Sequence, residues 1–237
     1  ALDRPSVGAV GQRAQMPFVV LGLGRLGLTE FDLASDADLV FVAASGTARE
    51  EVVYWTRLAE KTIEVLSSYT RDGTLFAVDT RLRPRGREGE LVVTADALLN
   101  YVEEAAHTWE ALTYLKACPV AGNIQLGRQT LARLAAALLD RFAAHPGLER
   151  ELQEMPRRLE REVAVPPSNT KTAPGGYYDI DFAVSLLRLR HRVTHSGCFN
   201  LAQQIEALRA AGLLSEEDAH VLTEGAAFLR SVDHAIR

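Results

Sequence analysis

The sequence predicts an α+β protein in which a small mixed sheet is followed by a helical, bundle-like part. Two observations indicate this class: apolar runs of strand length occupy the first third of the chain, and beyond about residue 94 apolar residues recur at helical spacing. We expect residues 1–122 to form the α/β domain and residues 123–237 to form the helical domain. A chain of 237 residues is long enough for this division.

Three apolar segments predict the strands of the first domain. Residues 18–23 (FVVLGL) and 38–43 (DLVFVA) are continuous apolar runs, which is typical of buried strands, and residues 75–82 (LFAVDTRL) form a third candidate. Between the second and third, residues 49–69 change to helical periodicity. One face of that helix would carry Val52, Trp55, Ala59, Ile63 and Leu66.

The second domain is predicted to be almost entirely helical. Residues 131–142 place a broad apolar stripe on one face, and residues 178–193 repeat the pattern. Between these helices, residues 164–176 hold three prolines and two glycines, which indicates a loop. Ser215 followed by Asp218 resembles a capping box and predicts the start of a last helix.

Composition narrows the class of protein. A net charge of −5 argues against general nucleic-acid binding, which usually shows a basic excess. Cys118 and Cys198 are far apart in sequence and predict neither a disulfide framework nor a zinc site, so we expect a reducing, cytoplasmic location. No apolar run is long enough for a membrane span, and residues 1–16 lack a signal-peptide pattern. We expect the chain to be a piece of a longer protein.

The segment Gly-Leu-Gly-Arg-Leu-Gly at residues 22–27 matches the GxGxxG pattern of dinucleotide-binding folds. Such a fold needs a full crossover helix after the glycines and an acidic residue near the end of the next strand. Only about ten residues separate Gly27 from Asp38, and that strand ends in two alanines. The spacing therefore excludes the dinucleotide interpretation.

A set of acids fits the same region better. Asp36 and Asp38 stand two residues apart where a strand begins, so both carboxylates can face one site, with Cβ atoms roughly 6.5–7 Å apart. On the strand predicted over 75–82, Asp79 would share a face with Arg81 and Arg83. A half-buried face with an acid and two arginines is costly unless it meets a counter-charge.

Three carboxylates from two neighbouring strands suit a pair of Mg²⁺ ions, which prefer oxygen ligands and bridge phosphates. Arg81 and Arg83 would then contact phosphate oxygens, while Ser35 adds a hydroxyl beside the metals. Gly22 and Gly24 allow close approach of the backbone to phosphate. Simpler explanations exist for single features, since most Asp-x-Asp pairs are solvated and the arginines could pair with nearby glutamates. The combination is much harder to explain without a ligand.

Four ordered blocks carry a resemblance to a known family: LGLGRLG…SDADLVFV, VDTRLRPRGREGELVVT, YVEEAAHTWEALTYLKACPVAGN and GGYYDIDF. They span roughly residues 18–191, and together they resemble one catalytic half of glutamine synthetase adenylyltransferase/adenylyl-removing enzymes, in the polymerase-β-like nucleotidyltransferase superfamily. The resemblance implies a polymerase-β-like sheet domain followed by helices. It also implies Mg²⁺-dependent transfer of AMP from ATP to a tyrosine of glutamine synthetase, under control of PII-type signalling proteins.

The resemblance assigns roles to individual positions. Metal-binding and catalytic roles fall on Asp36, Asp38 and Asp79. Nucleotide-binding roles fall on Gly22, Gly24, Arg25, Ser35, Arg81 and Arg83. Arg25 departs from the family, which usually has lysine there, and Leu28 replaces a frequent glycine. An acidic role for Asp181 and a role for Lys171 are weaker expectations.

Alternatives stay open at this stage. The same residues would serve the reverse reaction, in which phosphate removes AMP from adenylylated glutamine synthetase. A catalytically silent module that senses nucleotide is a second alternative, although it has no need of all three acids. A polymerase-like enzyme acting on nucleic acid is disfavoured by the acidic net charge.

Overall fold

The computed structural model of the chain describes residues 16–32, 35–71, 73–152, 154, 170–195 and 197–236. The strands are β1 (Phe18–Gly22), β2 (Ala37–Ala43), β3 (Val78–Asp79), β4 (Val92–Thr94) and β5 (Cys118–Gly122). The helices are α1 (Gly24–Gly27), α2 (Arg49–Ser67), α3 (Ala95–Glu104), α4 (Thr108–Tyr114), α5 (Ile124–Phe142), α7 (Tyr177–Arg190), α8 (Leu201–Ala210) and α9 (Glu216–Ile236), with a 3₁₀ turn η2 at Gly86–Glu88. The predicted α+β class is confirmed.

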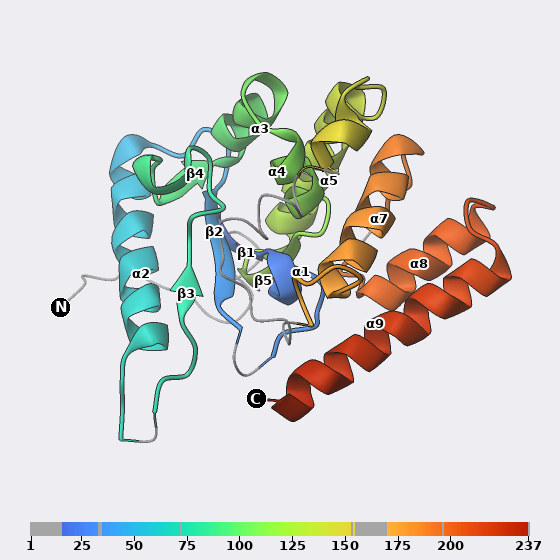
Figure 1. Cartoon of the computed structure of the whole chain (residues 1–237). Coiled ribbons are helices and arrows are strands. Elements are labelled where there is room, and N and C mark those ends of the chain that lie inside the picture. The colour runs from blue at the N-terminus through green and yellow to red at the C-terminus, as the bar shows by residue number, and fades with distance from the viewer. Residues whose placement is uncertain are drawn as a thin grey trace.

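The sheet is mixed, with the order β3-β2-β1-β5, and β4 also pairs with β2. Strand β1 is antiparallel to both β2 and β5, whereas β3 and β4 are parallel to β2. Strands β3 and β4 therefore follow one another along the same edge of β2. Helix α2 lies on one side of this sheet, with α3, α4 and α5 on the other and α7, α8 and α9 beyond them (Figure 1).

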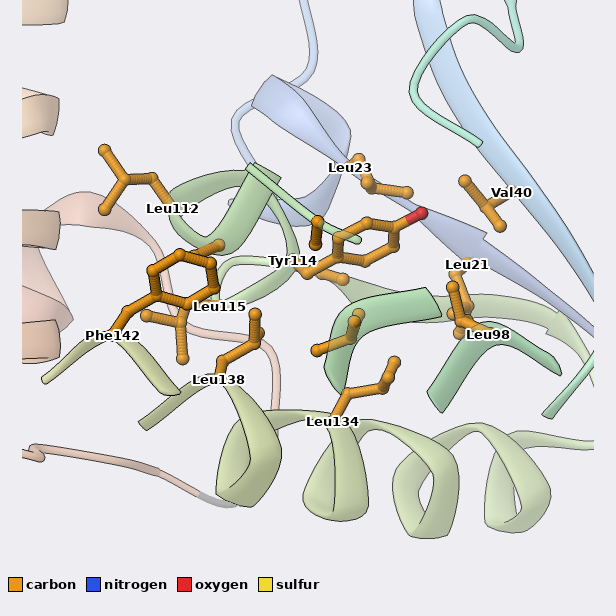
Figure 2. Close-up of a cluster of buried hydrophobic side chains, with 14 of the residues drawn as sticks. Leu21, Leu23, Val40, Leu98, Leu112, Tyr114, Leu115, Leu134, Leu138 and Phe142 are labelled. Carbon is orange, nitrogen blue, oxygen red and sulfur yellow. The ribbon is translucent and has the colours of Figure 1, made fainter. Parts of the chain in front are cut away.

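Both faces of β1 and β2 are buried, which explains why these strands are continuously apolar. Val19, Leu21, Val40 and Val42 belong to a core shared with α3, α4 and α5, whereas the alternate residues face α2. On the α2 side the ring of Phe18 stacks on Trp55, with centroids 4.8 Å apart. Figure 2 shows the other side, where side chains of α5 such as Leu134 and Leu138 face the sheet.

The first two predicted strands and helix α2 agree with the structure to within two residues at each end. The strand predicted over residues 75–82 is present but much shorter than expected, because only Val78 and Asp79 of this range pair with β2. Beyond them the chain turns, and Arg85 adopts a positive φ of 62°. This turn is held from within: the Arg83 guanidinium donates to the carbonyls of Thr80 at 2.8 Å, Arg87 at 3.0 Å and Gly89 at 3.1 Å.

The later helices form a second packed group. Helices α7, α8 and α9 share a small apolar core that includes Tyr177, Val184 and Ile205. Ser215 caps α9 as predicted, since its hydroxyl accepts from the backbone N–H of Asp218 at 3.0 Å. Of the predicted loop over 164–176, residues 164–169 lie outside the described residues.

Helix α5 follows the expected domain boundary directly and yet packs against β1 and β5. Leu134 and Leu138 on this helix share the core of the sheet (Figure 2). The hydrophobic core thus continues past residue 122, and the division into residues 1–122 and 123–237 remains a prediction.

The cysteines differ from the expectation. Cys118 at the start of β5 and Cys198 before α8 form a disulfide, with Cα atoms 5.2 Å apart. The sequence did not predict this bond because 80 residues separate the two cysteines and only the packing of the α7–α8 connection against β5 brings them together. None of the helices in the described ranges combines the length and the apolarity needed to cross a membrane.

Candidate active site

The three predicted acids line one cavity. Strand register places Asp79 of β3 directly opposite Asp38 of β2, and Asp36 precedes β2 on the same side. The cavity has a volume of about 330 Å³. It is lined by Gly24, Arg25, Leu28, Ser35, Asp36, Asp38, Asp79, Arg81, Lys171, Tyr177, Tyr178 and Asp181. Seven of the nine predicted site residues are in this set; Gly22 and Arg83 are not.

The acids repel one another. Burial, followed by the negative charges of Asp79 and Asp36, raises the pKa of Asp38 from 3.8 to about 6, while Arg81 opposes the change. Burial also favours a higher pKa for Asp79, but hydrogen bonds from Arg81 outweigh this effect and lower it. A divalent cation among the three carboxylates would relieve this repulsion.

The two predicted arginines point to different places. Arg81 folds back on Asp79, with its Nε 2.7 Å from Oδ2 and its backbone N–H donating to Oδ1 at 2.8 Å. Its side chain is 60% exposed, so it remains movable at the cavity mouth. Arg83 is engaged by the carbonyls of its own turn. The predicted common face fails because the strand ends at Asp79.

The glycine turn lies directly against the acids. Gly24 has a φ of +54°, and a Cβ at this position would collide with Asp38 Oδ2. The backbone N–H of Leu23 donates to the Asp38 carbonyl at 2.9 Å, which fixes the turn to β2. Glycine at position 24 is therefore required both for the backbone conformation and for the closeness of the carboxylate.

Arg25 and Ser35 extend the polar lining. Arg25 forms an ion pair with Asp32 and lies 3.5 Å from Asp233, with its guanidinium 4.9 Å from the centroid of the Tyr177 ring. Its Nε and Nη2, like the Ser35 hydroxyl, are buried and have no hydrogen-bond partner within the residues that the structure covers. Buried polar atoms of this kind usually meet a ligand or water.

The wall opposite the acids comes from α7. A buried ion pair holds it, with Lys116 Nζ 2.6 Å from Asp181 Oδ2 and both side chains 7% exposed. Tyr177 donates to Glu30, whose other oxygen accepts from the Leu201 backbone at 2.9 Å. The sequence gives Asp181 only a weak role and does not single out Lys116. The GGYYDIDF block was the available signal.

Asp179 behaves differently from Asp181, as helical geometry predicts for residues two apart. Its carboxylate accepts from the Gly175 backbone at 2.7 Å, immediately before α7. Asp179 therefore stabilises the start of the helix, whereas Asp181 faces the cavity.

No three His, Cys, Asp or Glu side chains in the described part of the chain are arranged closely enough to enclose a metal ion. The chemistry of the acid set nevertheless fits Mg²⁺, because the hard oxygen donors Asp36, Asp38 and Asp79 converge on one cavity. A cavity with these donors, a glycine turn and an exposed arginine has the composition of a nucleotidyl-transfer site.

Comparison with known proteins identifies the family. Residues 5–133 match the family model described as glutamate-ammonia ligase adenylyltransferase, and residues 147–237 match one described as GlnD PII-uridylyltransferase. Two relatives are named bifunctional glutamine synthetase adenylyltransferase/adenylyl-removing enzyme. The Streptomyces avermitilis protein is 36% identical over 92% of this chain, and the Pseudomonas aeruginosa protein is 33% identical over 96%.

The first match covers more than half of the chain, so the chain belongs to the glutamate-ammonia ligase adenylyltransferase family. It spans about a quarter of the length of the curated relatives, 22% of the Streptomyces avermitilis protein and 25% of the Streptomyces coelicolor protein. The family resemblance inferred from the sequence blocks is confirmed.

Proposed function

We propose that this chain carries an adenylyltransferase site that moves AMP from ATP to a tyrosine of glutamine synthetase. The convergence of Asp36, Asp38 and Asp79 on one cavity carries the proposal, because two adjacent strand ends supply a set of oxygen donors suited to a metal–triphosphate complex. Family membership supports the choice of AMP and of glutamine synthetase, since the relatives are named for that pair.

The three acids would hold two Mg²⁺ ions, and such ions neutralise the charge of a bound triphosphate. Ser35 and Arg25 would donate hydrogen bonds to the nucleotide, because their buried donor atoms lack partners within the described residues. Gly24 leaves room for the nucleotide beside Asp38. These residues bind and orient the nucleotide, and positioning supplies much of the rate enhancement.

Asp79 is our choice for accepting the proton of the tyrosine hydroxyl, and Arg81 would control it. In the free protein Arg81 lowers the pKa of Asp79 and makes it a weak base. Because Arg81 is exposed, we propose that it leaves Asp79 for phosphate oxygens when nucleotide binds. The loss of the hydrogen bonds from Arg81 would raise the pKa of Asp79 and so oppose the lowering that bound Mg²⁺ would cause, at the moment that the acceptor arrives.

The reverse reaction is the second candidate. The relatives are named for both adenylyl transfer and adenylyl removal, and the acid set serves either direction. Phosphate would attack the tyrosyl-AMP bond and release ADP. A module that senses nucleotide without turnover is the third candidate, and the complete acid set argues against it.

Further aspects follow from the same proposal. PII-type signalling proteins are proposed regulators of the longer protein, and the match of residues 147–237 to a PII-uridylyltransferase model supports a link to that system. We propose a cytoplasmic location, where ATP is available, and no nucleic-acid or membrane partner.

The direct test incubates the 237-residue chain with labelled ATP, Mg²⁺ and unmodified glutamine synthetase, and in parallel with phosphate and adenylylated glutamine synthetase. We expect label on a tyrosine in the first reaction. Release of ADP in the second reaction alone would identify the reverse activity. Nucleotide binding without either product would identify the sensing module.

A further inference from the structure

A second cavity lies at the C-terminal half of α7, between α5 and the segment that follows α7. Its volume is about 690 Å³, against 330 Å³ for the candidate active site, and the two share no lining residue. Apolar side chains of α5, including Leu131, Ala135 and Leu139, form one wall. Helices α5 and α7 are neighbours in the fold (Figure 1). Cavities of this size hold small organic ligands.

The walls of this second cavity are tied together. Ala117 and Pro119 line it from the start of β5, and Gly197 lines it from the α7–α8 connection. The disulfide between Cys118 and Cys198 joins these two segments beside their lining residues. The cavity therefore lies where β5 packs against the segment that connects α7 to α8.

A buried cation that has no acidic partner among the described residues lines this space. Arg188 on α7 lines the cavity, and only 2% of its surface is exposed. Its Nη1 donates to Gln204 at 2.6 Å and its Nη2 donates over a long 3.5 Å to the Leu115 carbonyl, while its Nε has no acceptor in the described residues. Asp181, the acid that favours its charge, is already paired with Lys116.

Burial of Arg188 disfavours its charged form and is therefore unfavourable for the fold. Burial lowers its pKa to about 10, and the charge of Asp181 only partly opposes the effect. A buried guanidinium without a carboxylate is expensive, and a planar anion that meets it with two hydrogen bonds restores the balance.

His195 supplies a second buried polar atom that has no hydrogen-bond partner in the described residues. Its Nδ1 lies 3.1 Å from the Gly197 carbonyl, which can only accept, so Nδ1 carries the proton. The other nitrogen, Nε2, is then a bare acceptor, and it is buried without a donor in the described residues. Burial and the charge of Arg188 lower the pKa of His195 to about 4, so the ring stays neutral at pH 7. The cavity thus offers a cationic donor and a neutral acceptor.

We propose that this second cavity binds a small organic carboxylate that has an apolar body and a hydroxyl or amino donor. The carboxylate would meet Arg188, the donor would meet His195 Nε2, and the apolar body would cover the α5 wall. Inorganic phosphate fits less well, because it would leave that wall unoccupied. The two cavities share no lining residue, so binding at this site can be measured without the proposed nucleotide chemistry.

The test is a calorimetric titration of the chain, without ATP or glutamine synthetase, with 4-hydroxybenzoate and with 2-hydroxy-4-methylpentanoate. We expect at least one probe to bind with a Kd below about 1 mM. Two analogues of the first probe are matched controls: 4-methoxybenzoate lacks the donor, and 4-hydroxybenzyl alcohol lacks the carboxylate. Each should bind at least about tenfold more weakly.

Variants of the chain test whether the probes bind in the second cavity. Arg188→Gln removes the charge, and Ala135→Phe fills the cavity from the half-buried face of α5; each should weaken binding at least about tenfold. Arg192→Gln is the matched control, because Arg192 pairs with Asp140 at the surface. Should Arg188→Gln fail to fold, Ala135→Phe decides. Absence of binding of both probes, or equal binding by all variants, would overturn the proposal.

Discussion

The two walls of the candidate active site are positioned in different ways. One wall, called the acid wall, carries Asp36, Asp38 and Asp79. Backbone pairing sets it, because the register of β2 with β3 puts Asp38 opposite Asp79. Side-chain pairs across long sequence distances set the α7 wall, chiefly Lys116 with Asp181, 65 residues apart. The proposed chemistry therefore lies on the wall that backbone pairing sets, whereas the opposite wall depends on buried charges that must stay paired.

The largest expected effect is on the acid wall. Asp36→Asn or Asp38→Asn should reduce AMP transfer at least about 10³-fold, roughly 4 kcal/mol in the barrier, because each removes a charged oxygen donor. The fold should persist, since neither side chain makes a buried pair. Radiolabel transfer and circular dichroism measure the two properties. Asp140→Asn on the exposed face of α5 is the control, and equal losses in that variant would contradict the assignment.

Substitutions in the α7 wall should lower the free energy of unfolding. Lys116→Met leaves Asp181 buried without a cation and should lower the free energy of unfolding by about 3 kcal/mol. The double variant Lys116→Met/Asp181→Leu should regain most of the loss. Urea unfolding measures both, with Arg133→Met as the control, since its pair with Asp96 is half exposed. A stable single variant would show that the pair does not hold this wall.

A smaller loss is expected at the other buried anchor of α7. Tyr177→Phe removes the hydrogen bond to Glu30 and should cost about 2 kcal/mol, because the acceptor is charged and buried. Tyr69→Phe, at a side chain that is 88% exposed, should change stability by less than about 0.5 kcal/mol. Thermal unfolding of the two variants compares them, and equal stabilities would rule out a structural role for the bond.

The smallest effect is a gain in the free energy of unfolding, opposite in sign to the losses above, and it concerns the acid wall. The pKa of Asp38 is raised from 3.8 to about 6 by burial and neighbouring acids, so its ionised form disfavours folding. Asp38→Asn in EDTA should therefore gain about 1 kcal/mol of stability above pH 6, after a discount for partial exposure, and gain nothing below pH 4. Urea midpoints at pH 4 and pH 8 test this. A gain that is constant with pH would refute the electrostatic cause.

Sequence reasoning succeeded where structure is set locally. The continuous apolar runs gave β1 and β2, and the period of a strand put Asp36 and Asp38 on one side. It failed for Arg83, because alternation along residues 75–82 suggested a strand where the arginine instead ties a turn together.

Other features could not be predicted because they depend on tertiary packing. The pairing of Lys116 with Asp181 and the bond between Cys118 and Cys198 join segments that carry no local sign of their partners. The second cavity likewise forms between segments that are distant in the sequence, α5 and the connection between α7 and α8. Buried polar residues in these segments look like ordinary surface residues in the sequence alone.

In the proposed site, three acids on adjacent strands hold divalent cations against a triphosphate. Crystals of the chain soaked with Mn²⁺ and a non-hydrolysable ATP analogue test it most directly by anomalous diffraction. We expect manganese peaks bounded by Asp36, Asp38 and Asp79, with the triphosphate beside Gly24. Bound analogue with manganese elsewhere, or with none, would contradict the account.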